Sequence, residues 1–416
     1  MCRASAIGQE KIYQALSQKG FSPNSTETLS VVLKIASYRT WKRFYNVEKP
    51  IRCATFRQFC EFLGLDWQEV VDPTTLRKQP IVQDFDSAPL AAPCFGRQEE
   101  LQKLKQWLLQ DEYYLVILYG LGGVGKSTLA RKLAADLQSQ FTQVVWQTFS
   151  YSDSTERILQ ELLDRLSPGS LSFADFQVGL SARSLTEKLI AALRQQKALV
   201  ILDEIGSSET NPQKRREAHQ RFSRVWQDLS TNQRSRIVVT TCEKPPDFTV
   251  LAGAAGGKGR SYALGGLDEE ACYKLLETHQ LAFDEQSAGQ LIELYDGNPM
   301  ALTLAAATIQ QSFHGDITQF LRYSYLPDAV EAILEQHWNG LNPQERAILC
   351  CLANSEPLHL DELRESLTQQ VGNNRGLLPA KSALERRSLL VSVAEDTQVL
   401  YTLQPMVRRF CQRRCG

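Results

Sequence analysis

One glycine-rich segment limits the fold of this 416-residue chain more than any other feature. It reads Gly120-Leu121-Gly122-Gly123-Val124-Gly125-Lys126-Ser127-Thr128, which matches the pattern G-x-x-x-x-G-K-[ST]. The apolar run 113–119 before it predicts a buried strand, and the run 129–138 after it predicts an amphipathic helix. A strand, a glycine-rich loop and a helix in this order predict a phosphate-binding loop in an α/β domain.

Each residue type in this loop has a physical role toward a phosphate chain. Glycine permits backbone conformations and close approaches that a Cβ atom would block. The loop amides and the N-terminus of the following helix favour anionic oxygens. The Lys126 amine can reach the β- and γ-phosphates, and the Ser127 hydroxyl can bind Mg²⁺. We therefore expect ATP or ADP to be bound by Gly120, Gly122, Gly123, Val124, Gly125, Lys126, Ser127 and Thr128.

Two further strands end in polar residues that suit the same site. Residues 197–204 form an apolar run that ends in Asp203 and Glu204, at the end of a strand where α/β sheets bind ligands. We expect Asp203 to hold Mg²⁺ largely through water, and Glu204 to polarise an attacking water as a general base. The run 235–241 ends in hydroxyl residues, of which Thr240 is expected to sense the γ-phosphate. That assignment depends on the position of this strand after the acidic one, because threonine is common in strands.

The order of the elements predicts a multidomain chain of α/β and α units. Apolar strands alternate with helical stretches from residue 94 to about 267, which is typical of a parallel sheet. Helical patterns follow, and two strand-like runs lie near the end of the sequence. We expect a helical, helix-turn-helix-like domain at 1–72, a proline-containing linker at 73–93, a P-loop domain at 94–267, a small helical domain at 268–325 and a winged helix at 326–416.

Charge and composition narrow the function further. Lys and Arg total 46 against 47 Asp and Glu, which excludes a globally basic nucleic-acid binder. The longest apolar runs fall well short of the ~20 residues of a membrane span. The N-terminal segment lacks the apolar core of a secretory signal. We therefore expect a cytoplasmic protein that has no membrane partner.

The ten cysteines and five histidines do not predict a metal site. No C-x-x-C or H-x-x-x-H spacing occurs, so a zinc site is not expected. For a cytosolic protein we expect scattered free thiols. The alternative is a reactive pair on a terminal helix formed by Cys411 and Cys415, which lie one helical turn apart beside several arginines.

Together these segments resemble the NB-ARC group of signal-transduction ATPases, a branch of the AAA+-like P-loop proteins, over about residues 93–416. The phosphate loop, the acidic strand and the hydroxyl-ended strand occur in the family's order. Phe95-Gly96-Arg97 is similar to the family's entry segment, which packs near the adenine. Gly297-Asn298-Pro299-Met300-Ala301-Leu302 is similar to its G-x-P-x-A-L motif, and the resemblance implies that Pro299 contacts the base.

The resemblance also implies a mode of action. In the family a nucleotide lies between the α/β domain, a small helical domain and a winged helix. ADP holds the domains closed, and exchange for ATP opens them and allows a homo-oligomer to form. Helical patterns at 345–353, 360–367 and 379–387 and a hairpin at 389–394 and 398–403 fit the winged helix, which we expect to close over the nucleotide rather than to read DNA.

Three departures from the family pattern bear on this switch. Many relatives carry an arginine where this chain has Cys242, so the positive group there is missing or comes from Arg236, Lys244 or another protomer. Gln404 stands where the family has a histidine that contacts the ADP phosphate. An amide can donate a hydrogen bond but carries no charge, so we expect the closed state to be less strongly locked. No sensor repeats follow the winged helix, so we expect sensing to use another surface or another chain, or this to be a shortened version.

The N-terminal region predicts short helices with a local positive charge. We expect helices at 12–19, 26–36, 38–45, 55–63 and 66–70. The string from Thr40 to Trp67 resembles modules at the head of cyanobacterial NB-ARC proteins and, loosely, the repressor-type helix-turn-helix with 38–45 as its reading helix. Seven basic residues from Lys34 to Arg57, against Glu48 alone, fit a phosphate-contacting surface. DNA binding and interaction with an effector protein both stay open, because fold does not determine function.

The sequence therefore predicts a nucleotide-operated switch. We expect it to bind Mg-ATP, to hydrolyse ATP slowly and to transmit domain opening and oligomerisation through the N-terminal module. One alternative is a DNA-binding transcription regulator whose assembly is controlled by the P-loop domain. The other is a turnover ATPase such as a motor or transporter subunit, against which the helical and winged modules argue.

Overall fold

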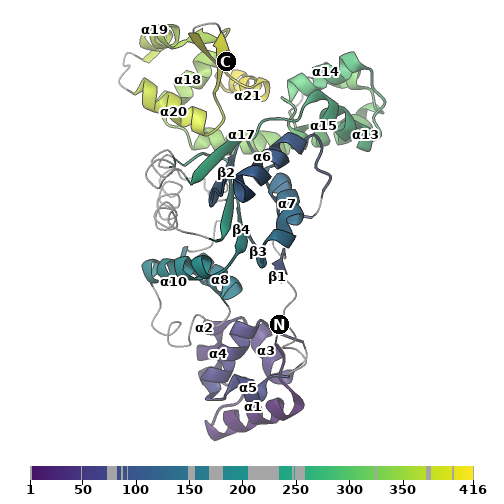
Figure 1. The fold of residues 1–416 in the computed structure, drawn as a ribbon. Helices are drawn as coiled ribbons and strands as arrows, with labels where there is room; N and C mark the ends of the chain where they lie inside the picture. Colours follow the sequence, from purple (N-terminus) through teal and green to yellow (C-terminus); the bar gives the residue numbers. More distant parts are fainter. Residues whose placement is uncertain are drawn as a thin grey trace.

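Figure 1 shows the chain as a computed structural model, with the N-terminal helices at one end, the main sheet in the middle and the C-terminal helices at the other end. The structure describes residues 2–47, 49–72, 82–85, 88–90, 92–148, 155–167, 181–204, 234–245, 248, 258–323, 326–371, 376–395 and 398–415. Most of the expected linker at 73–93 therefore lies outside the described residues.

A six-stranded sheet forms the centre of the structure. Its strands are β1 Val82–Asp84, β2 Leu115–Tyr119, β3 Gln143–Thr148, β4 Ala198–Asp203, β5 Arg236–Thr241 and β6 Gly259–Ala263. They are ordered β1-β3-β4-β5-β2-β6, and every pair of neighbours runs parallel, which confirms the expected parallel sheet. Because β5 lies between β2 and β4, the phosphate loop, Asp203 and Thr240 come to one edge of the sheet.

Strand β1 extends this sheet with a segment that the sequence suggested was linker. It pairs with β3 in a register that runs from Val82 opposite Gln143 to Asp84 opposite Val145. A strand of three residues is too short to show a periodic pattern, so hydrophobic periodicity did not reveal it. The stretch between the N-terminal module and the P-loop domain therefore contributes an edge strand.

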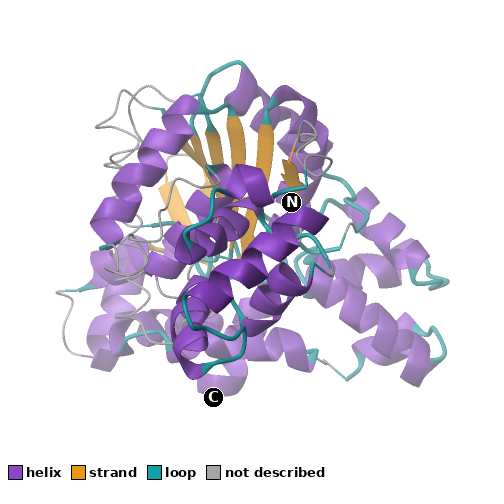
Figure 2. Cartoon of the chain, turned by 90° about the horizontal axis from the view of Figure 1, so that it is seen from below, coloured by secondary structure: helices purple, strands orange, loops and turns teal. Residues whose placement is uncertain are grey.

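Helices cover both faces of the sheet, as Figure 2 shows. On one face α6 Gln98–Leu109 and α7 Lys126–Leu137 pack through side chains that include Leu104 and Leu133, and the short 3-10 helix η2 Gln138–Gln140 follows α7. On the other face α8 Thr155–Leu166 and α10 Ala182–Gln195 pack through side chains that include Leu159 and Leu189. Strands covered on both faces read as unbroken apolar runs, which explains why β2 and β4 stood out in the sequence.

The C-terminal helices and a small sheet share one apolar core. The first group is α13 Glu269–Thr278, α14 Glu285–Leu294, α15 Pro299–Phe313 and α16 Ile317–Leu321. The second is α17 Asp328–Asn339, α18 Pro343–Ala353, β7 Leu358–His359, α19 Leu360–Val371, α20 Leu377–Arg386, β8 Val391–Glu395, β9 Gln398–Thr402 and α21 Pro405–Cys415. β8 and β9 form an antiparallel hairpin, and β7 pairs with β9, as expected for a winged helix.

Local sequence explains where two of these helices begin. The Asn298 side chain accepts a hydrogen bond from the Ala301 amide (3.1 Å), and Pro299 occupies the first helical position of α15. The Asn342 and Glu345 side chains form a reciprocal capping box at the start of α18. Both starts matter for the site, because α15 begins at the phosphate loop and α18 carries Glu345.

The N-terminal module contains the expected short helices around an aromatic core. They are α1 Ala6–Gln18, α2 Thr26–Ile35, α3 Tyr38–Asn46, α4 Cys53–Leu63 and α5 Trp67–Val70. The fully buried Trp41 ring lies 5.0 Å from Phe59 and 5.4 Å from Phe44, and its Nε1 donates to the Pro23 carbonyl (2.8 Å). The opposite side of α3 carries exposed basic residues, among them Arg39 and Lys42.

Four cysteines are disulfide-bonded, so the expectation of free thiols is wrong at these positions. Cys2 pairs with Cys53, and Cys350 pairs with Cys415. The alternative of a pair between Cys411 and Cys415 is also wrong, because Cys411 is a buried free thiol. Each bond joins residues more than fifty positions apart, which spacing along the chain cannot show.

Among the described residues, no helix combines the length and the apolar character needed to cross a membrane.

Candidate functional site

The phosphate loop lies between β2 and α7 and is shaped by its glycines. Gly123 and Gly125 have φ angles of +79° and +97°, a left-handed conformation that favours glycine. A Cβ atom on Gly122 would lie 2.6 Å from Cγ2 of Ile333, and one on Gly123 would lie 2.7 Å from Cβ of Met300. The loop therefore fits closely beneath the start of α15 and one face of α17.

Lys126 occupies the first turn of α7 and is turned over the loop. Its buried amine donates to the carbonyls of Gly120 (2.9 Å) and Leu121 (3.0 Å) and lies 3.8 Å from Sγ of Cys242. Arg236 and Lys244, the alternatives for the missing positive group, lie elsewhere. Arg236 donates to the Leu108 carbonyl from the start of β5, and the Lys244 amine lies over aromatic rings. Of these three cations, Lys126 is the one that lines the cavity described below.

Three hydrogen bonds connect the residues at the ends of β4 and β5 to one another and, through Ser127, to the phosphate loop. One carboxylate oxygen of Asp203 accepts from the Ser127 hydroxyl (2.8 Å) and from the Thr240 hydroxyl (2.6 Å). The Glu204 amide donates to Thr240 Oγ1 (2.9 Å). Three separate sequence motifs thus meet at one carboxylate, as the parallel sheet order requires.

Burial dominates the electrostatics of the two carboxyl groups. It raises the pKa of Asp203, although the hydrogen bonds from Thr240 and Ser127 and the charge of Lys126 act in the opposite direction. Burial and the charge of Asp203 likewise raise the pKa of Glu204, which Lys126 partly offsets. Glu204 also has a φ of +63°, uncommon for a residue with a Cβ. A cation beside these carboxylates would favour their charged forms.

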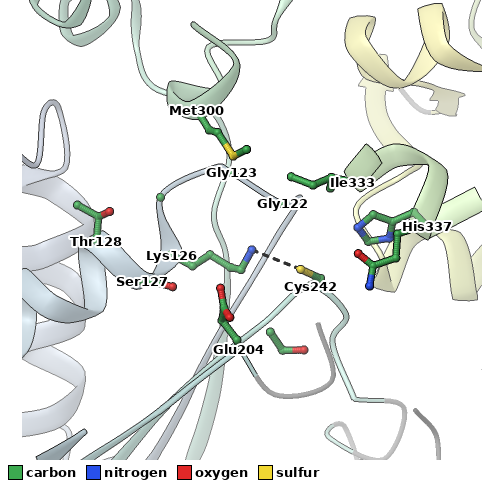
Figure 3. A pocket seen from close by; sticks show the side chains of 13 residues that line it. Gly122, Gly123, Lys126, Ser127, Thr128, Glu204, Cys242, Met300, Ile333 and His337 are labelled. Atoms are coloured by element: carbon green, nitrogen blue, oxygen red, sulfur yellow. Dashed lines mark hydrogen bonds between the residues drawn. The ribbon is translucent and has the colours of Figure 1, made fainter. Parts of the chain in front are cut away.

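A cavity of about 490 Å³ opens over the loop (Figure 3). Its lining includes seven residues expected at a nucleotide site, which are Gly122, Gly123, Gly125, Lys126, Ser127, Thr128 and Glu204. It also includes Thr241, Cys242, Met300, Ile333, Gln336 and His337. The glycine cradle, the buried amine and the hydroxyl–carboxylate pair of Ser127 and Asp203 fit a nucleotide phosphate chain with Mg²⁺. Sequence reasoning did not assign Ile333, Gln336 or His337, because no local motif marks the face of α17.

The entry segment holds the loop from outside the cavity. The buried Arg97 guanidinium donates to Glu100 Oε1 (2.7 Å) and to the carbonyls of Gly265 (2.7 Å) and Val124 (3.2 Å). Phe95 packs against the C-terminal core. A Cβ on Gly96 would lie 2.3 Å from Cβ of Ala271. Contact of these three residues with a nucleotide stays a prediction.

The motif at the start of α15 meets the loop directly. The Asn298 side-chain amide donates to the Gly122 carbonyl (3.0 Å), and the Met300 amide donates to the Gly123 carbonyl (3.3 Å). A Cβ on Gly125 would lie 3.7 Å from Cγ of Pro299, so the proline adjoins the loop, and its contact with the base stays a prediction. Gln404 is different: its carbonyl accepts from the Arg408 amide at the start of α21, and its side chain does not line the cavity.

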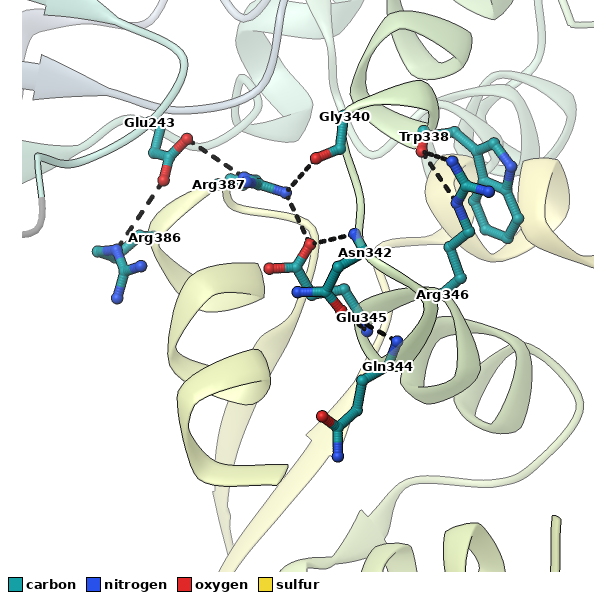
Figure 4. Close-up of polar contacts among 9 residues, drawn as sticks. All are labelled: Glu243, Trp338, Gly340, Asn342, Gln344, Glu345, Arg346, Arg386 and Arg387. Carbon is teal, nitrogen blue, oxygen red and sulfur yellow. Dashed lines mark hydrogen bonds and ion pairs between the residues drawn. The ribbon is translucent and has the colours of Figure 1, made fainter. Parts of the chain in front are cut away.

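A buried ion cluster joins the end of β5 to the winged helix (Figure 4). The Arg387 guanidinium lies 3.2 Å from Glu243 Oε2 and 3.1 Å from Glu345 Oε2. Its Nη1 also donates to the Gly340 carbonyl (3.5 Å), just after α17. The Lys244 amide donates to the Arg386 carbonyl (2.9 Å). Glu243 directly follows the cavity residues Thr241 and Cys242. One short segment therefore contacts both the cavity and the ion cluster around Arg387.

Comparison with known proteins agrees with this geometry. Residues 97–286 match the family model described as the NB-ARC domain. An uncharacterized WD repeat-containing protein of Nostoc sp. is 29% identical over 98% of this chain, which spans 35% of that protein. A disease resistance-like protein of Arabidopsis thaliana is 24% identical over 55% of this chain, which covers 19% of its length. Among solved structures, a Walker-type ATPase of Pyrococcus abyssi has a TM-score of 0.56 at 17% identity, over 80% of this chain and 98% of that one.

Proposed function

We propose that this chain, in which residues 97–286 match the NB-ARC domain model, is a P-loop signal-transduction ATPase that acts as an ADP/ATP-dependent switch. In this proposal it binds Mg-ATP, hydrolyses it slowly and couples the nucleotide state to domain opening and homo-oligomerisation. The single observation that carries the proposal is the convergence of Ser127, Asp203 and Thr240 beneath a cavity that α17 also lines.

The residues divide the chemistry among them. Ser127 and Asp203 would hold Mg²⁺, which when bound neutralises phosphate charge. Lys126 stabilises negative charge on the phosphates, and Thr240 keeps the Asp203 carboxylate oriented. Glu204 would accept a proton from an attacking water, a task that its raised pKa suits. Slow turnover is expected, because among the described residues lining the cavity Lys126 is the one permanent cation.

The winged helix supplies the coupling in this proposal. The Thr241–Glu243 segment contacts the cavity at one end and the Arg387 cluster at the other. A nucleotide shifts such an arrangement only by the difference in its affinities for the closed and open states. We propose that ADP favours the closed arrangement and that ATP favours opening.

The output would pass through the N-terminal module, either to an effector protein or to DNA. Exposed Arg39 and Lys42 on α3 favour DNA as the second candidate, a transcription regulator whose assembly the P-loop domain controls. If the protein assembles in a nucleotide-dependent way but shows no salt-sensitive binding to DNA, the output to an effector protein is the candidate that remains.

The experiment combines identification of the copurified nucleotide with light scattering. We expect wild-type protein to retain ADP as a monomer and to assemble after exchange for a non-hydrolysable ATP analogue with Mg²⁺. Lys126→Ala should lose nucleotide and stay monomeric. The proposal is wrong if folded wild-type protein binds neither nucleotide with Mg²⁺ present.

A further inference from the structure

We propose that His337 contacts the phosphate chain of the bound nucleotide and thereby reports its presence to the winged helix. This inference rests on the proposed function, since it needs a nucleotide in the cavity. It assigns to α17 the role that the sequence resemblance gave to Gln404. The argument starts from the face that α17 presents to the phosphate loop.

That face is formed by Ile333, Gln336 and His337, which all line the cavity. Their spacing of three and four residues places them on one side of the helix. Ile333 approaches the loop so closely that Gly122 has no room for a Cβ atom. Val330 and Leu334, in contrast, belong to the apolar core of the C-terminal domains. One side of α17 is therefore core and another side is the wall of the cavity.

His337 brings hydrogen-bonding capacity to this wall. Its side chain is largely buried, with 6% of the residue surface exposed, and it lies one helical turn beyond Ile333. In Figure 3 its ring lies beyond Cys242, on the side of the cavity away from Ser127 and Thr128. An imidazole donates at least one hydrogen bond in either protonation state, and two when charged. It can therefore satisfy a phosphate oxygen on the side of the cavity away from Ser127 and Thr128.

Several contacts hold α17 to the rest of the winged helix. Arg387 donates to the Gly340 carbonyl that follows α17. Arg346 donates to the Trp338 carbonyl from α18 (3.2 Å), and Arg414 of α21 pairs with Glu335. A phosphate that engages His337 therefore engages the whole winged helix, including the cluster with Glu243. Gln404 lies at the start of α21 and does not line the cavity.

The test measures the dissociation of a fluorescent ADP analogue with Mg²⁺ from the full chain. His337→Ala should weaken ADP binding about tenfold, the loss expected for one hydrogen bond to a charged group. His337→Gln retains a donor and should recover part of that affinity. Matched controls are Gln404→Ala and His279→Gln, the latter a half-buried histidine that does not line the cavity, and both should stay within about twofold of wild type.

Two results would overturn the inference. One is unchanged ADP affinity in folded His337→Ala. The other is a loss in Gln404→Ala that equals or exceeds the loss in the His337 variants. If His337→Ala does not fold, the ADP affinities of His337→Gln and His279→Gln are compared instead. A weaker affinity in His337→Gln supports the inference, and equal affinities overturn it. Failure of the proposed function looks different, because wild-type protein itself would then show no nucleotide binding.

Discussion

Nε of Arg387 lies 3.2 Å from Oε2 of Glu243, although the two residues are 144 positions apart in the chain. Both side chains are buried, with 5% and 10% of their surfaces exposed. Glu345 lies on the other side of the same guanidinium. A buried cation between two carboxylates is costly to break, because the remaining charges would lose their compensation. The contact therefore favours one arrangement of the P-loop domain and the winged helix.

Glu243→Gln is expected to loosen this arrangement while it keeps the shape of the side chain. The amide can still accept a hydrogen bond, but the charge that attracts Arg387 is lost. We expect the release of a fluorescent ADP analogue to accelerate about tenfold, since a hydrogen bond to a charged group contributes roughly 1.5–3 kcal/mol. Stopped-flow displacement measures this rate.

The matched control is Glu187→Gln, which removes a carboxylate from an exposed pair with Arg183. Such surface pairs contribute about 0–1 kcal/mol, so ADP release should change by less than about threefold. Equal rates in wild type and Glu243→Gln would show that the ion cluster does not control closure.

The stability of the nucleotide-free protein should depend on pH through Asp203. Burial raises the pKa of this carboxyl in the folded state. The folded state therefore binds this proton more tightly than the unfolded state does. The stabilisation that results is fully present below the ordinary carboxyl pKa of ~3.9, and it is lost as the pH rises through the raised pKa of the folded state. Asp203→Asn removes that loss and can still accept the hydrogen bonds from Ser127 and Thr240.

The measurement is the melting temperature of both proteins without nucleotide between pH 5 and pH 8. Asp203→Asn should melt at a higher temperature than wild type at the upper end, and the difference should shrink toward the lower end. A difference that grows as the pH falls would have the wrong sign. Added Mg²⁺ with ADP should stabilise wild type more than Asp203→Asn, because the variant lacks the carboxylate.

Gly123→Ala should damage the phosphate loop. Its φ of +79° strains a residue with a side chain by roughly 1–2 kcal/mol. The added Cβ would also lie 2.7 Å from Cβ of Met300 and 3.0 Å from Oδ1 of Asn298, so the start of α15 must move. We expect lower stability to urea and loss of ADP binding. Gly289→Ala is the control, since nothing lies within 4 Å of its added Cβ and alanine favours helix α14.

How much of this site the sequence predicts depends on whether the signal is local. The loop from Gly120 to Thr128 is contiguous, Asp203 is the last residue of one apolar strand and Thr240 the last but one of another, so their meeting follows from a parallel sheet. His337 gives no such signal, because its role depends on how α17 lies over the loop. The Arg387 cluster and the cysteine pairs likewise join distant segments that no spacing rule connects. The sequence therefore predicts the residues that belong to contiguous motifs, whereas the contacts between domains are seen only in the folded structure.

The disulfide between Cys350 and Cys415 should stabilise the winged helix by tying α21 to α18. It closes a loop of 65 residues, and loss of such a bond costs about 2–4 kcal/mol. Cys350→Ser should therefore lower the urea midpoint of unfolding. A reducing agent should lower the midpoint of the wild type through both disulfides, but it should lower the midpoint of the variant only through the loss of the Cys2–Cys53 bond. Cys94→Ser, at a half-buried free thiol, is the control and should leave the midpoint nearly unchanged. Thiol labelling in denaturant provides the direct count: labelling of all ten cysteines without reductant would contradict both disulfides.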